Sequence, residues 1–365
     1  MTELRRAQQR GVRLPLTDCV YQVTMTFQIT VQPSGHQFSC EPDETVLGAA
    51  IRAGIGLPYG CKNGACSSCK GKVLAGAVTH RAHQQRALTD EEEAQGFSLF
   101  CCATTDADLV IEAREVTGSS DYPVRKMPSR VASIDKVAPD VAIITLQLPA
   151  NEALAYRPGQ YIEFMLRDGK RRSYSMANAP SLEAPITLHI RYMAGGLFTE
   201  QVFNTMKERD ILRFEGPHGS FFLREESDKP IVLLASGTGF APIKALMEHM
   251  LHLKSPRPVS LYWGGRRPLD LYMNALCEQW AATLPHVRYV PVVSHALPED
   301  HWTGRTGFVH SAVMQDLPDL SGYQVYACGA PVVVDSARRD YVAQCALPPD
   351  EFYADAFTSE ADLHS

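Results

Sequence analysis

The sequence predicts a multidomain α+β and α/β protein in which a small mixed domain, an antiparallel β-barrel and a parallel sheet follow one another. Three observations support this prediction. The chain has 365 residues, enough for two or three domains of roughly 150 residues each. Short alternating strands between Gly and Pro turns fill its middle, as in a small barrel. Apolar strands that alternate with helical stretches fill its last third, as in a parallel sheet covered by helices.

Composition argues against several classes of protein. The formal charge is -6, and the only basic cluster lies in the N-terminal tail, which argues against a nucleic-acid-binding surface. No apolar run approaches the roughly 18 residues that a membrane span needs. The first residues lack the apolar core and the cleavage site of a secretory signal. We therefore expect a cytoplasmic protein without a membrane span.

The first domain is expected over residues 23–116. Residues 1–22 lack apolar periodicity and are expected to be disordered, so that Met25 is a candidate for the natural start. A strand (FQITVQP) and a second strand near Phe38 come next, followed by a helix (ETVLGAAIRAG), a cysteine-rich loop and a strand (KGKVLAG). SLFCC and LVIEAREV predict further strands.

The acidic run DEEE at 90–93 has two interpretations. It is either a docking patch for a basic partner or the first turn of a helix, where acidic side chains are favourable. Thr89 and Glu92 have the spacing of a capping box. We favour the capping interpretation.

The loop YGCKNGACSSC contains three cysteines at a spacing that packing does not require. Cys61, Cys66 and Cys69 follow C-x4-C-x2-C, the spacing of a plant-type 2Fe-2S cluster, whose fourth thiolate arrives from a distant strand. Structural zinc is the alternative, but it usually uses two C-x2-C pairs. Gly60 and Gly64 let the backbone wrap closely, with N–H groups directed at the sulfurs. We favour the iron-sulfur cluster.

The fourth ligand is either Cys101 or Cys102, both in SLFCC. Adjacent residues of a strand face opposite sides, so only one of them reaches the iron. The other has the role of a small buried hydrophobic residue.

A linker is expected over residues 117–129 and a flavin-binding barrel over 130–227. R-x-Y-S, with Arg172, Tyr174 and Ser175, supplies a guanidinium for a pyrophosphate, an aromatic ring for a flavin and a hydroxyl for the flavin N5 edge. Alone, this tetrapeptide is more often a plain edge strand. RYMAGGLFT strengthens the signal, because its residues bring backbone amides and a hydroxyl to phosphates. These residues are Gly195, Gly196 and Thr199.

The last domain is expected over residues 228–365. ASGTGFAP ends an apolar strand and opens a helix, which is typical of a loop that approaches a pyrophosphate. Its pattern, G-x-G-x-x-P, departs from the dinucleotide fingerprint and is weak alone. Cys328 follows a later strand end, where ligands of open α/β sheets bind, and it is either a nicotinamide contact or a core thiol. The candidate residues in ASGTGFAP are Gly237, Thr238, Gly239 and Pro242.

In this order, the motifs resemble the ferredoxin-NADP reductase superfamily, in the form that carries a plant-type ferredoxin domain at the N-terminus. The resemblance covers essentially everything from Met25 onward. It implies a β-grasp ferredoxin domain, an FAD-binding barrel and a nicotinamide-binding domain. Within the superfamily, the chain looks closest to the CDP-6-deoxy-3,4-glucoseen reductases of 3,6-dideoxyhexose synthesis. The segments that carry this likeness include LPYGCKNGACSSCKG, RRSYSMANAP, GPHGSFFLR, ASGTGFAPIKALMEHM, LYWGGRR, WTGRTGFVH, YACGAP and FYADAF.

The resemblance also implies residue roles. The ferredoxin pattern L-x-C-x-A selects Cys101 as the fourth ligand, and the R-x-Y-S, GG-x-x-T and G-x-G-x-x-P residues would hold FAD and the dinucleotide. Phe357 in FYADAF could lie against the flavin, although the chain continues past it. Arg266 and Arg267 would suit the 2'-phosphate of NADPH and Asp270 the 2'-hydroxyl of NADH. The resemblance favours NADH.

The expected function is an NAD(P)H:acceptor oxidoreductase that passes electrons from NADH through FAD and a 2Fe-2S cluster to a partner protein. Ser175 would orient the flavin N5 edge and Cys328 would lie near the nicotinamide, as the catalytic residues. The partner is a pyridoxamine-dependent dehydrase or, alternatively, an oxygenase component. A subunit of a membrane NADH:quinone complex and a zinc-binding module without enzyme activity are further alternatives. The first would need a membrane span, and the second leaves the flavin motifs unexplained.

Overall fold

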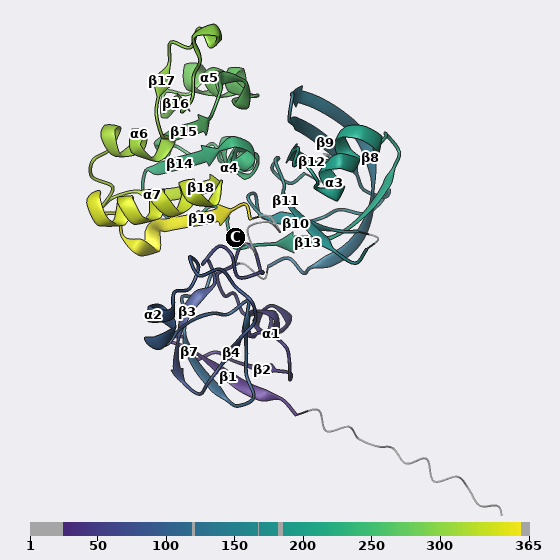
Figure 1. The fold of residues 1–365 in the computed structure, drawn as a ribbon, viewed down its shortest axis with the longest axis vertical. Coiled ribbons are helices and arrows are strands. Elements are labelled where there is room, and N and C mark those ends of the chain that lie inside the picture. Colours follow the sequence, from purple (N-terminus) through teal and green to yellow (C-terminus); the bar gives the residue numbers. More distant parts are fainter. Residues whose placement is uncertain (1–24, 119–120, 167, 182–184, 359–365) are drawn as a thin grey trace, which may run out of the picture.

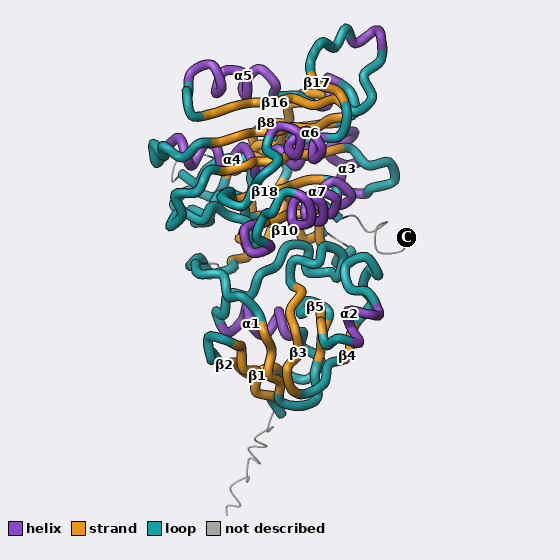
Figure 2. Tube along the Cα trace, turned by 90° about the vertical axis from the view of Figure 1, so that its left-hand side faces the viewer, coloured by secondary structure: helices purple, strands orange, loops and turns teal. Residues whose placement is uncertain are grey.

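The computed structural model describes residues 25–118, 121–166, 168–181 and 185–358. Three domains pack around a common centre, with the N-terminal domain below the other two in Figure 1. Figure 2 shows the same division from the side. In the described part of the chain, no helix is long and apolar enough to cross a membrane. Residues 1–22 lie outside the described residues, so their expected disorder stays a prediction.

The N-terminal domain has the expected β-grasp fold. Its mixed five-stranded sheet has the order β2-β1-β7-β3-β5, and a two-stranded sheet, β4-β6, lies beside it. Helix α1 begins where Thr45 accepts a hydrogen bond from the Gly48 N–H (3.1 Å), and it ends at Gly54, whose φ of 75° is left-handed. The elements are β1 (Phe27–Gln32), β2 (Gln37–Cys40), α1 (Val46–Ala53), β3 (Lys70–Ala75), β4 (Thr79–His80), α2 (Asp90–Ala94), β5 (Phe97–Leu99), β6 (Ala103–Thr104) and β7 (Leu109–Glu112).

The capping interpretation of the acidic run is confirmed. The Thr89 hydroxyl accepts from the Glu92 N–H (3.2 Å), and the Glu92 carboxylate accepts from the Thr89 N–H (3.0 Å). Glu92 also pairs with Lys70 at 2.7 Å. The Glu92 carboxylate is thus bonded to partners in its own domain.

The strand expected at SLFCC is shorter than predicted. Strand β5 ends at Leu99, and the chain turns over Phe100–Cys102, where the Cys102 N–H donates to the Leu99 carbonyl at 2.9 Å. We expected strand alternation to place Cys101 and Cys102 on opposite sides, and this expectation is wrong because neither residue lies in a strand. Both are buried.

The middle domain is an antiparallel barrel. Its six strands have the order β11-β10-β13-β8-β9-β12, and a single bridge between Met176 and Leu188 joins the two outer strands. A short helix, α3, follows β12. The elements are β8 (Arg125–Ala138), β9 (Val141–Gln147), β10 (Tyr161–Met165), β11 (Arg171–Ser175), β12 (Ile186–Arg191), α3 (Leu197–Glu200), a π-helical turn (Gln201–Thr205) and β13 (Ile211–His218).

The barrel starts earlier than predicted. Residues 125–129, expected in the linker, form the first part of β8 and pair with β13, with Arg125 opposite Gly216 and Ser129 opposite Leu212. Their Pro and charged residues mimic a linker, but alternate side chains, Met127 and Ser129, are buried. The interdomain linker is correspondingly shorter.

The C-terminal domain has the expected parallel sheet, with the order β17-β16-β15-β14-β18-β19. The chain runs outward from β14 to β17 and then returns to β18, so the order reverses between β14 and β18. At such a switch point the strand ends leave a crevice that binds ligands. The elements are β14 (Ile231–Ser236), α4 (Phe240–His252), β15 (Val259–Gly265), α5 (Asn274–Thr283), β16 (Val287–Val293), β17 (Arg305–Thr306), α6 (Val309–Asp316), β18 (Gln324–Gly329), α7 (Pro331–Gln344) and β19 (Phe352–Ala356).

Candidate functional site

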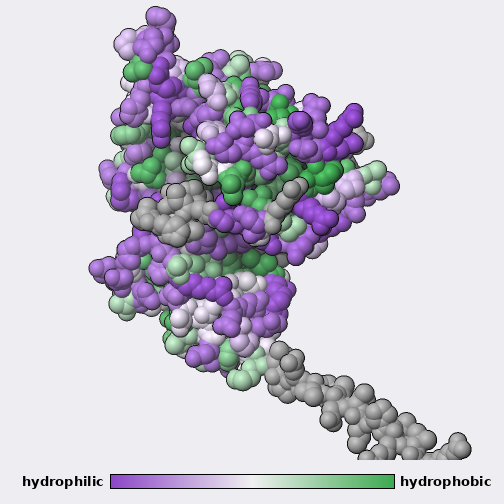
Figure 3. Space-filling model, turned by 45° about the vertical axis from the view of Figure 1, so that its right-hand side comes forward, coloured by the Kyte–Doolittle hydropathy of each residue, from purple (hydrophilic) through white to green (hydrophobic). Residues whose placement is uncertain are grey.

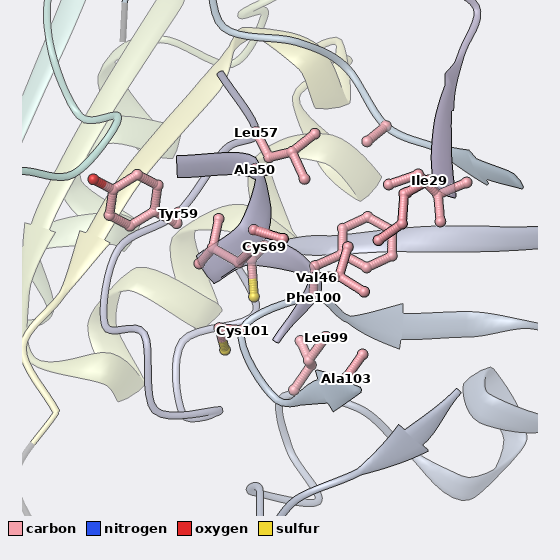
Figure 4. Close-up of a cluster of buried hydrophobic side chains, with 14 of the residues drawn as sticks. Ile29, Val46, Ala50, Leu57, Tyr59, Cys69, Leu99, Phe100, Cys101 and Ala103 are labelled. Carbon is pink, nitrogen blue, oxygen red and sulfur yellow. The ribbon is translucent and has the colours of Figure 1, made fainter. Parts of the chain in front are cut away.

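The fold brings four thiols into one group. The Cys61 thiol contacts those of Cys66 and Cys101, and Cys101 also contacts Cys69. The sulfurs of Cys69 and Cys101 lie at the edge of the domain core (Figure 4). The loop directs amides at these sulfurs, with the Cys61 N–H 3.3 Å from Cys66 Sγ and the Ala65 N–H 3.4 Å from Cys61 Sγ. Four grouped thiols with N–H donors fit an anionic 2Fe-2S cluster.

Cys102 lies behind this group. Its sulfur is 3.6 Å from Cys101 Sγ and 3.8 Å from the Ala82 carbonyl. A Cβ on Gly64 would be 2.7 Å from Cys102 Sγ, so the thiol packs under the glycine of the loop. This position suits a packing residue better than a ligand.

The cysteine loop, residues 59–69, is packed between the other two domains. On the barrel side, the Tyr59 N–H donates to Ser220 Oγ (2.9 Å), and the Ser220 N–H donates to the Tyr59 carbonyl (3.0 Å). On the other side, Cys66 belongs to the core cluster that includes Val334 and Phe352 of the C-terminal domain. The loop is therefore a three-domain contact.

The R-x-Y-S residues lie on β11, an outer strand of the barrel order. The ring of Tyr174 packs against Phe164 and Phe198, with centroids 6.0 and 5.3 Å apart. Arg172 shares the Tyr174 face, because side chains two residues apart in a strand point the same way. Ser175 points to the opposite face, toward the C-terminal domain.

The GG-x-x-T loop follows β12. Gly195 adopts a left-handed φ of 76° with no atom within 4 Å of its absent Cβ, so the backbone is open to a ligand there. The Thr199 hydroxyl is instead occupied by its own turn: it accepts from the Met193 N–H (3.1 Å) and contacts the Gly196 carbonyl (3.0 Å). We expected this hydroxyl to reach phosphates. In this structure its hydrogen bonds hold the turn of its own loop.

A groove of about 590 Å³, lined by both apolar and polar side chains, lies beside the Tyr174 cluster. Phe164 and Phe198 line it and also pack against Tyr174. Figure 3 shows hydrophobic side chains exposed in a hollow on the face of the molecule that carries the barrel. The barrel thus offers space for a large planar ligand next to its aromatic residues. Further lining residues are Met165, Leu166, Asp168, Leu197, Gln201, Ile211, Leu212 and Arg213.

Asp355 is a site residue that sequence analysis missed. It is 6% exposed, and the Ser175 hydroxyl donates to its Oδ2 at 3.2 Å. Its Oδ1 lies 3.4 Å from the position of a Cβ on Gly60, in the cysteine loop. Burial raises its pKa to about 6, although the bond from Ser175 lowers it in part. Asp355 therefore binds the barrel through Ser175 and lies close to Gly60 of the N-terminal domain, and the FYADAF segment was the only signal for it.

The loop after β14 and the end of β18 touch closely, as the switch point requires. A Cβ on Gly239 would lie 2.2 Å from the Cys328 carbonyl oxygen, and a Cβ on Gly329 would lie 2.3 Å from the Ser236 carbonyl oxygen. Only glycine fits at these positions. Thr238 lies between the two loop glycines and is buried. Pro242 lies in the first turn of α4, as predicted.

The side chain of Cys328 packs in the core of the C-terminal domain. Its side chain is 0% exposed and belongs to the core cluster that includes Phe240 and Trp263. Burial also raises the pKa of the thiol, which keeps it neutral. The position corresponds to the core-thiol alternative, and the residue shapes the crevice through its carbonyl group. Phe357, just after β19, is half-buried, and its N–H donates to the Gly329 carbonyl at 2.8 Å.

Arg191, at the end of β12, is a second residue that sequence analysis missed. Its guanidinium bridges the barrel and the C-terminal domain, at 3.1 Å from Asp140 and 3.4 Å from Asp270. It also lies 3.4 Å from the position of a Cβ on Gly237. Its buried Nε has no hydrogen-bond partner among the described residues. A donor left unpaired beside a glycine loop suits a phosphate ligand.

The residues expected to distinguish NADH from NADPH are engaged with one another. The Asp270 carboxylate accepts from the backbone N–H groups of Arg266 (2.7 Å) and Arg267 (3.0 Å). The Arg267 guanidinium binds Asp300 through two bonds of 2.6 Å. Arg267 is therefore committed to a carboxylate, while the side chain of Arg266 is exposed.

Comparisons with known proteins agree with this geometry. Residues 29–105 match the family of 2Fe-2S iron-sulfur cluster binding domains, residues 128–223 the oxidoreductase FAD-binding domains, and residues 233–339 the oxidoreductase NAD-binding domains. The chain thus carries domains for a 2Fe-2S cluster, FAD and NAD.

Whole-chain relatives have the same organisation. The CDP-6-deoxy-L-threo-D-glycero-4-hexulose-3-dehydrase reductase of Yersinia pseudotuberculosis is 39% identical, over 91% of this chain and 99% of that protein. Reductase component 1 of terephthalate 1,2-dioxygenase from Comamonas is 34% identical, over 93% of this chain and 100% of that protein. The crystal structure of the Amycolatopsis cytochrome P450 reductase has a TM-score of 0.74 at 32% identity, over 92% of this chain and 99% of that one. The chain therefore belongs to the ferredoxin-NADP reductase superfamily, as an electron-transfer reductase with an N-terminal 2Fe-2S domain.

Proposed function

We propose that the protein accepts a hydride from NADH at the crevice between β14 and β18 and delivers single electrons to a partner enzyme from the cysteine loop. When bound, FAD takes up the electron pair of a hydride and the 2Fe-2S cluster passes on single electrons. One observation carries this proposal: Asp355 contacts Ser175 on β11 and lies against Gly60 of the cysteine loop. This contact supports the proposal that the nicotinamide, flavin and cluster sites lie close together.

We propose that Cys61, Cys66, Cys69 and Cys101 ligate the cluster and that Cys102 does not. The support is the contact of Cys101 with both Cys61 and Cys69, whereas the position of Cys102 under Gly64 suits packing. Four thiolates complete the ligand set of a plant-type cluster.

Substituting these cysteines should separate the two halves of the reaction. Cys66→Ser should lose the iron-sulfur absorption and the reduction of one-electron acceptors, while NADH still bleaches the flavin. Cys102→Ser is the matched control and should retain both. Iron content and anaerobic absorption spectra measure these effects. Full iron content in Cys66→Ser, or its loss only in Cys102→Ser, would contradict the ligand assignment.

For FAD, we propose that Arg172 holds the pyrophosphate, Tyr174 covers the flavin and Ser175 orients the N5 edge. The loop with Gly195 and Gly196 would donate backbone N–H groups to the phosphates, with Thr199 shaping that loop. The support is the packing of Tyr174 on Phe164 and Phe198, which line the groove, and the openness of the backbone at Gly195. Phe357 is proposed to lie near the flavin because it follows Asp355 at the same junction.

Tyr174→Ala should weaken FAD binding roughly tenfold or more, since an aromatic contact contributes about 1.5 kcal/mol. Tyr174→Phe keeps the ring and should bind FAD nearly as well as the original protein. Fluorescence titration of the apoprotein with FAD measures both. Equal affinity for all three proteins would exclude Tyr174 as a flavin contact.

Asp355 is proposed to fix the Ser175 hydroxyl at the flavin site. Burial of its ionised carboxylate lowers the stability of the folded protein. Its pKa is about 6 in the fold against 3.8 ordinarily, so the folded state binds a proton more tightly than the unfolded state. Stability should therefore fall as pH rises from about 4 to about 6, by about 3 kcal/mol in total, and stay lowered above that range.

Asp355→Asn removes this titration. The melting temperature of the apoprotein should be higher in the variant at pH 8, and the difference should shrink as pH falls toward 5. Thermal unfolding across this range measures the difference. A difference that is constant with pH, or that grows in acid, would show that the pKa of the Asp355 carboxyl is not raised in the folded protein.

For the dinucleotide, we propose that Gly237, Thr238, Gly239 and Pro242 form the pyrophosphate loop, with Arg191 as an additional phosphate contact. We propose NADH as the preferred donor, because Asp270 lies in the turn that follows β15 and its charge disfavours a 2'-phosphate. The guanidinium of Arg267, which could otherwise pair with a 2'-phosphate, is bound to Asp300.

We propose that the electron acceptor is a dehydrase of deoxysugar synthesis of the pyridoxamine-dependent type. The support is the 39% identity to the hexulose-3-dehydrase reductase. A ring-oxidising oxygenase component is the second candidate, supported by the 34% identity to the terephthalate dioxygenase reductase. The site of action is proposed to be the cytoplasm, where the described cysteines, all unpaired, stay reduced.

Reconstitution with each partner class distinguishes the two candidates. Product formation at the expense of NADH should occur with the dehydrase and should be lost with Cys66→Ser. Turnover with the oxygenase component but not with the dehydrase would identify the oxygenase component as the partner.

A further inference from the structure

We propose that Tyr161 and Lys62 are positioning residues that hold the cysteine loop against the flavin barrel, and thereby set the rate at which electrons pass from the flavin to the cluster. This inference rests on the proposed relay from FAD to the 2Fe-2S cluster. It assigns to these residues a role that the cofactor motifs do not include.

Tyr161 links the flavin strand to the first ligand of the cluster. In the register of the barrel it lies opposite Ser175 on β11 and opposite His218 on β13. Its side chain is buried, and its hydroxyl donates to the Gly60 carbonyl at 2.7 Å. Gly60 directly precedes Cys61. The hydroxyl therefore fixes the peptide on one side of the first ligand.

Lys62 fixes the peptide on the other side of Cys61. Its ammonium group lies 2.9 Å from Glu163 Oε2, and the two side chains are 24% and 6% exposed. Glu163 follows Tyr161 by two residues on β10, so both side chains leave the same face of the strand. One strand of the barrel thus contacts both neighbours of Cys61.

The Lys62–Glu163 pair belongs to a larger group of charged side chains of opposite sign. Glu163 also pairs with Arg171 (3.2 Å), and Arg171 pairs with Glu215 (3.2 Å). His218 lies 3.6 Å from both carboxylates and stays neutral, because burial lowers its pKa to about 3. These two carboxylates and the histidine are close enough to hold a metal ion. Lys62 and Arg171 already neutralise the two carboxylates. We therefore interpret this group of side chains as an ion-pair network and not as a metal site.

A contact of this kind controls a rate because electron transfer slows steeply with distance. Holding Cys61 from both sides restricts how far the loop can move from the barrel. A displacement of the loop away from the barrel therefore slows the transfer. We expect a smaller effect for each contact alone, since the Tyr59–Ser220 pair remains.

The test uses anaerobic stopped-flow spectroscopy of protein loaded with FAD and cluster. Tyr161→Phe removes only the hydroxyl, and Lys62→Met removes only the charge. In both variants, flavin reduction by NADH should keep its rate, whereas cluster reduction should slow several-fold. Tyr156→Phe and Lys126→Met are matched controls that should keep both rates. Tyr156 donates to the Asn178 carbonyl inside the barrel, and Lys126 pairs with Glu215 on its exposed side.

A second readout does not depend on electron transfer. Hydrogen exchange of the amides in residues 59–66 should be faster in Tyr161→Phe and Lys62→Met than in the controls, because the loop is held less firmly. The midpoint potential of the cluster should stay unchanged in Tyr161→Phe, which keeps all charges.

Unchanged exchange or unchanged cluster reduction in both variants would overturn the inference. A shifted potential with unchanged exchange would also overturn it, since Lys62 would then act through charge alone. If the unmodified protein showed no electron transfer from the flavin to the cluster, the proposed relay would be contradicted. The hydrogen-exchange result would still test whether Tyr161 and Lys62 hold the loop.

Discussion

The packing of the cysteine loop against both other domains is the constraint on which the rest of the arrangement depends. A loop that directs its N–H groups at cluster sulfurs cannot pair regularly with its neighbours, so its remaining backbone groups need partners elsewhere. Here the partners come from the barrel: Ser220 pairs with both backbone groups of Tyr59, and Tyr161 pairs with the Gly60 carbonyl. Binding the cluster and docking the domain are therefore one structural requirement.

The same junction explains why unusual buried charges are retained. Asp355 carries a raised pKa and the Lys62–Glu163 pair is largely removed from solvent. Buried ion pairs seldom add net stability, because desolvation offsets the attraction. Their value here is geometric, since each one joins two domains at a defined position. Arg191 does the same on the other side of the barrel, between Asp140 and Asp270.

Local patterns were sufficient to predict the fold class and the cofactors. The spacing of Cys61, Cys66 and Cys69 identifies a loop whose geometry is set within nine residues, and G-x-G-x-x-P after an apolar strand identifies a strand-to-helix turn. The argument that strand alternation lets only one of Cys101 and Cys102 reach the iron failed, because a turn at Phe100–Cys102 replaces the expected strand. The linker boundary was wrong because Arg125–Ser129 have a linker composition but pair with β13.

The residues that join the domains could not be predicted. Asp355 meets Ser175 across 180 residues of sequence, and Tyr161 meets Gly60 across 101. No short pattern encodes such contacts, which depend on the parallel pairing of β19 with β18 and on how the domains dock. Cys328 illustrates the converse case. Its place at a strand end suggested a ligand contact, yet its side chain turns into the core.

The most direct test of the account is the response of the purified protein to excess NADH under anaerobic conditions. Visible absorption and low-temperature electron paramagnetic resonance would be recorded before and after the addition. The account predicts that the flavin absorption bleaches, that the iron-sulfur absorption falls with it, and that the signal of a reduced 2Fe-2S cluster develops. A bleached flavin beside a cluster that stays oxidised, or a protein without iron, would contradict the central claim that the three sites form one electron path.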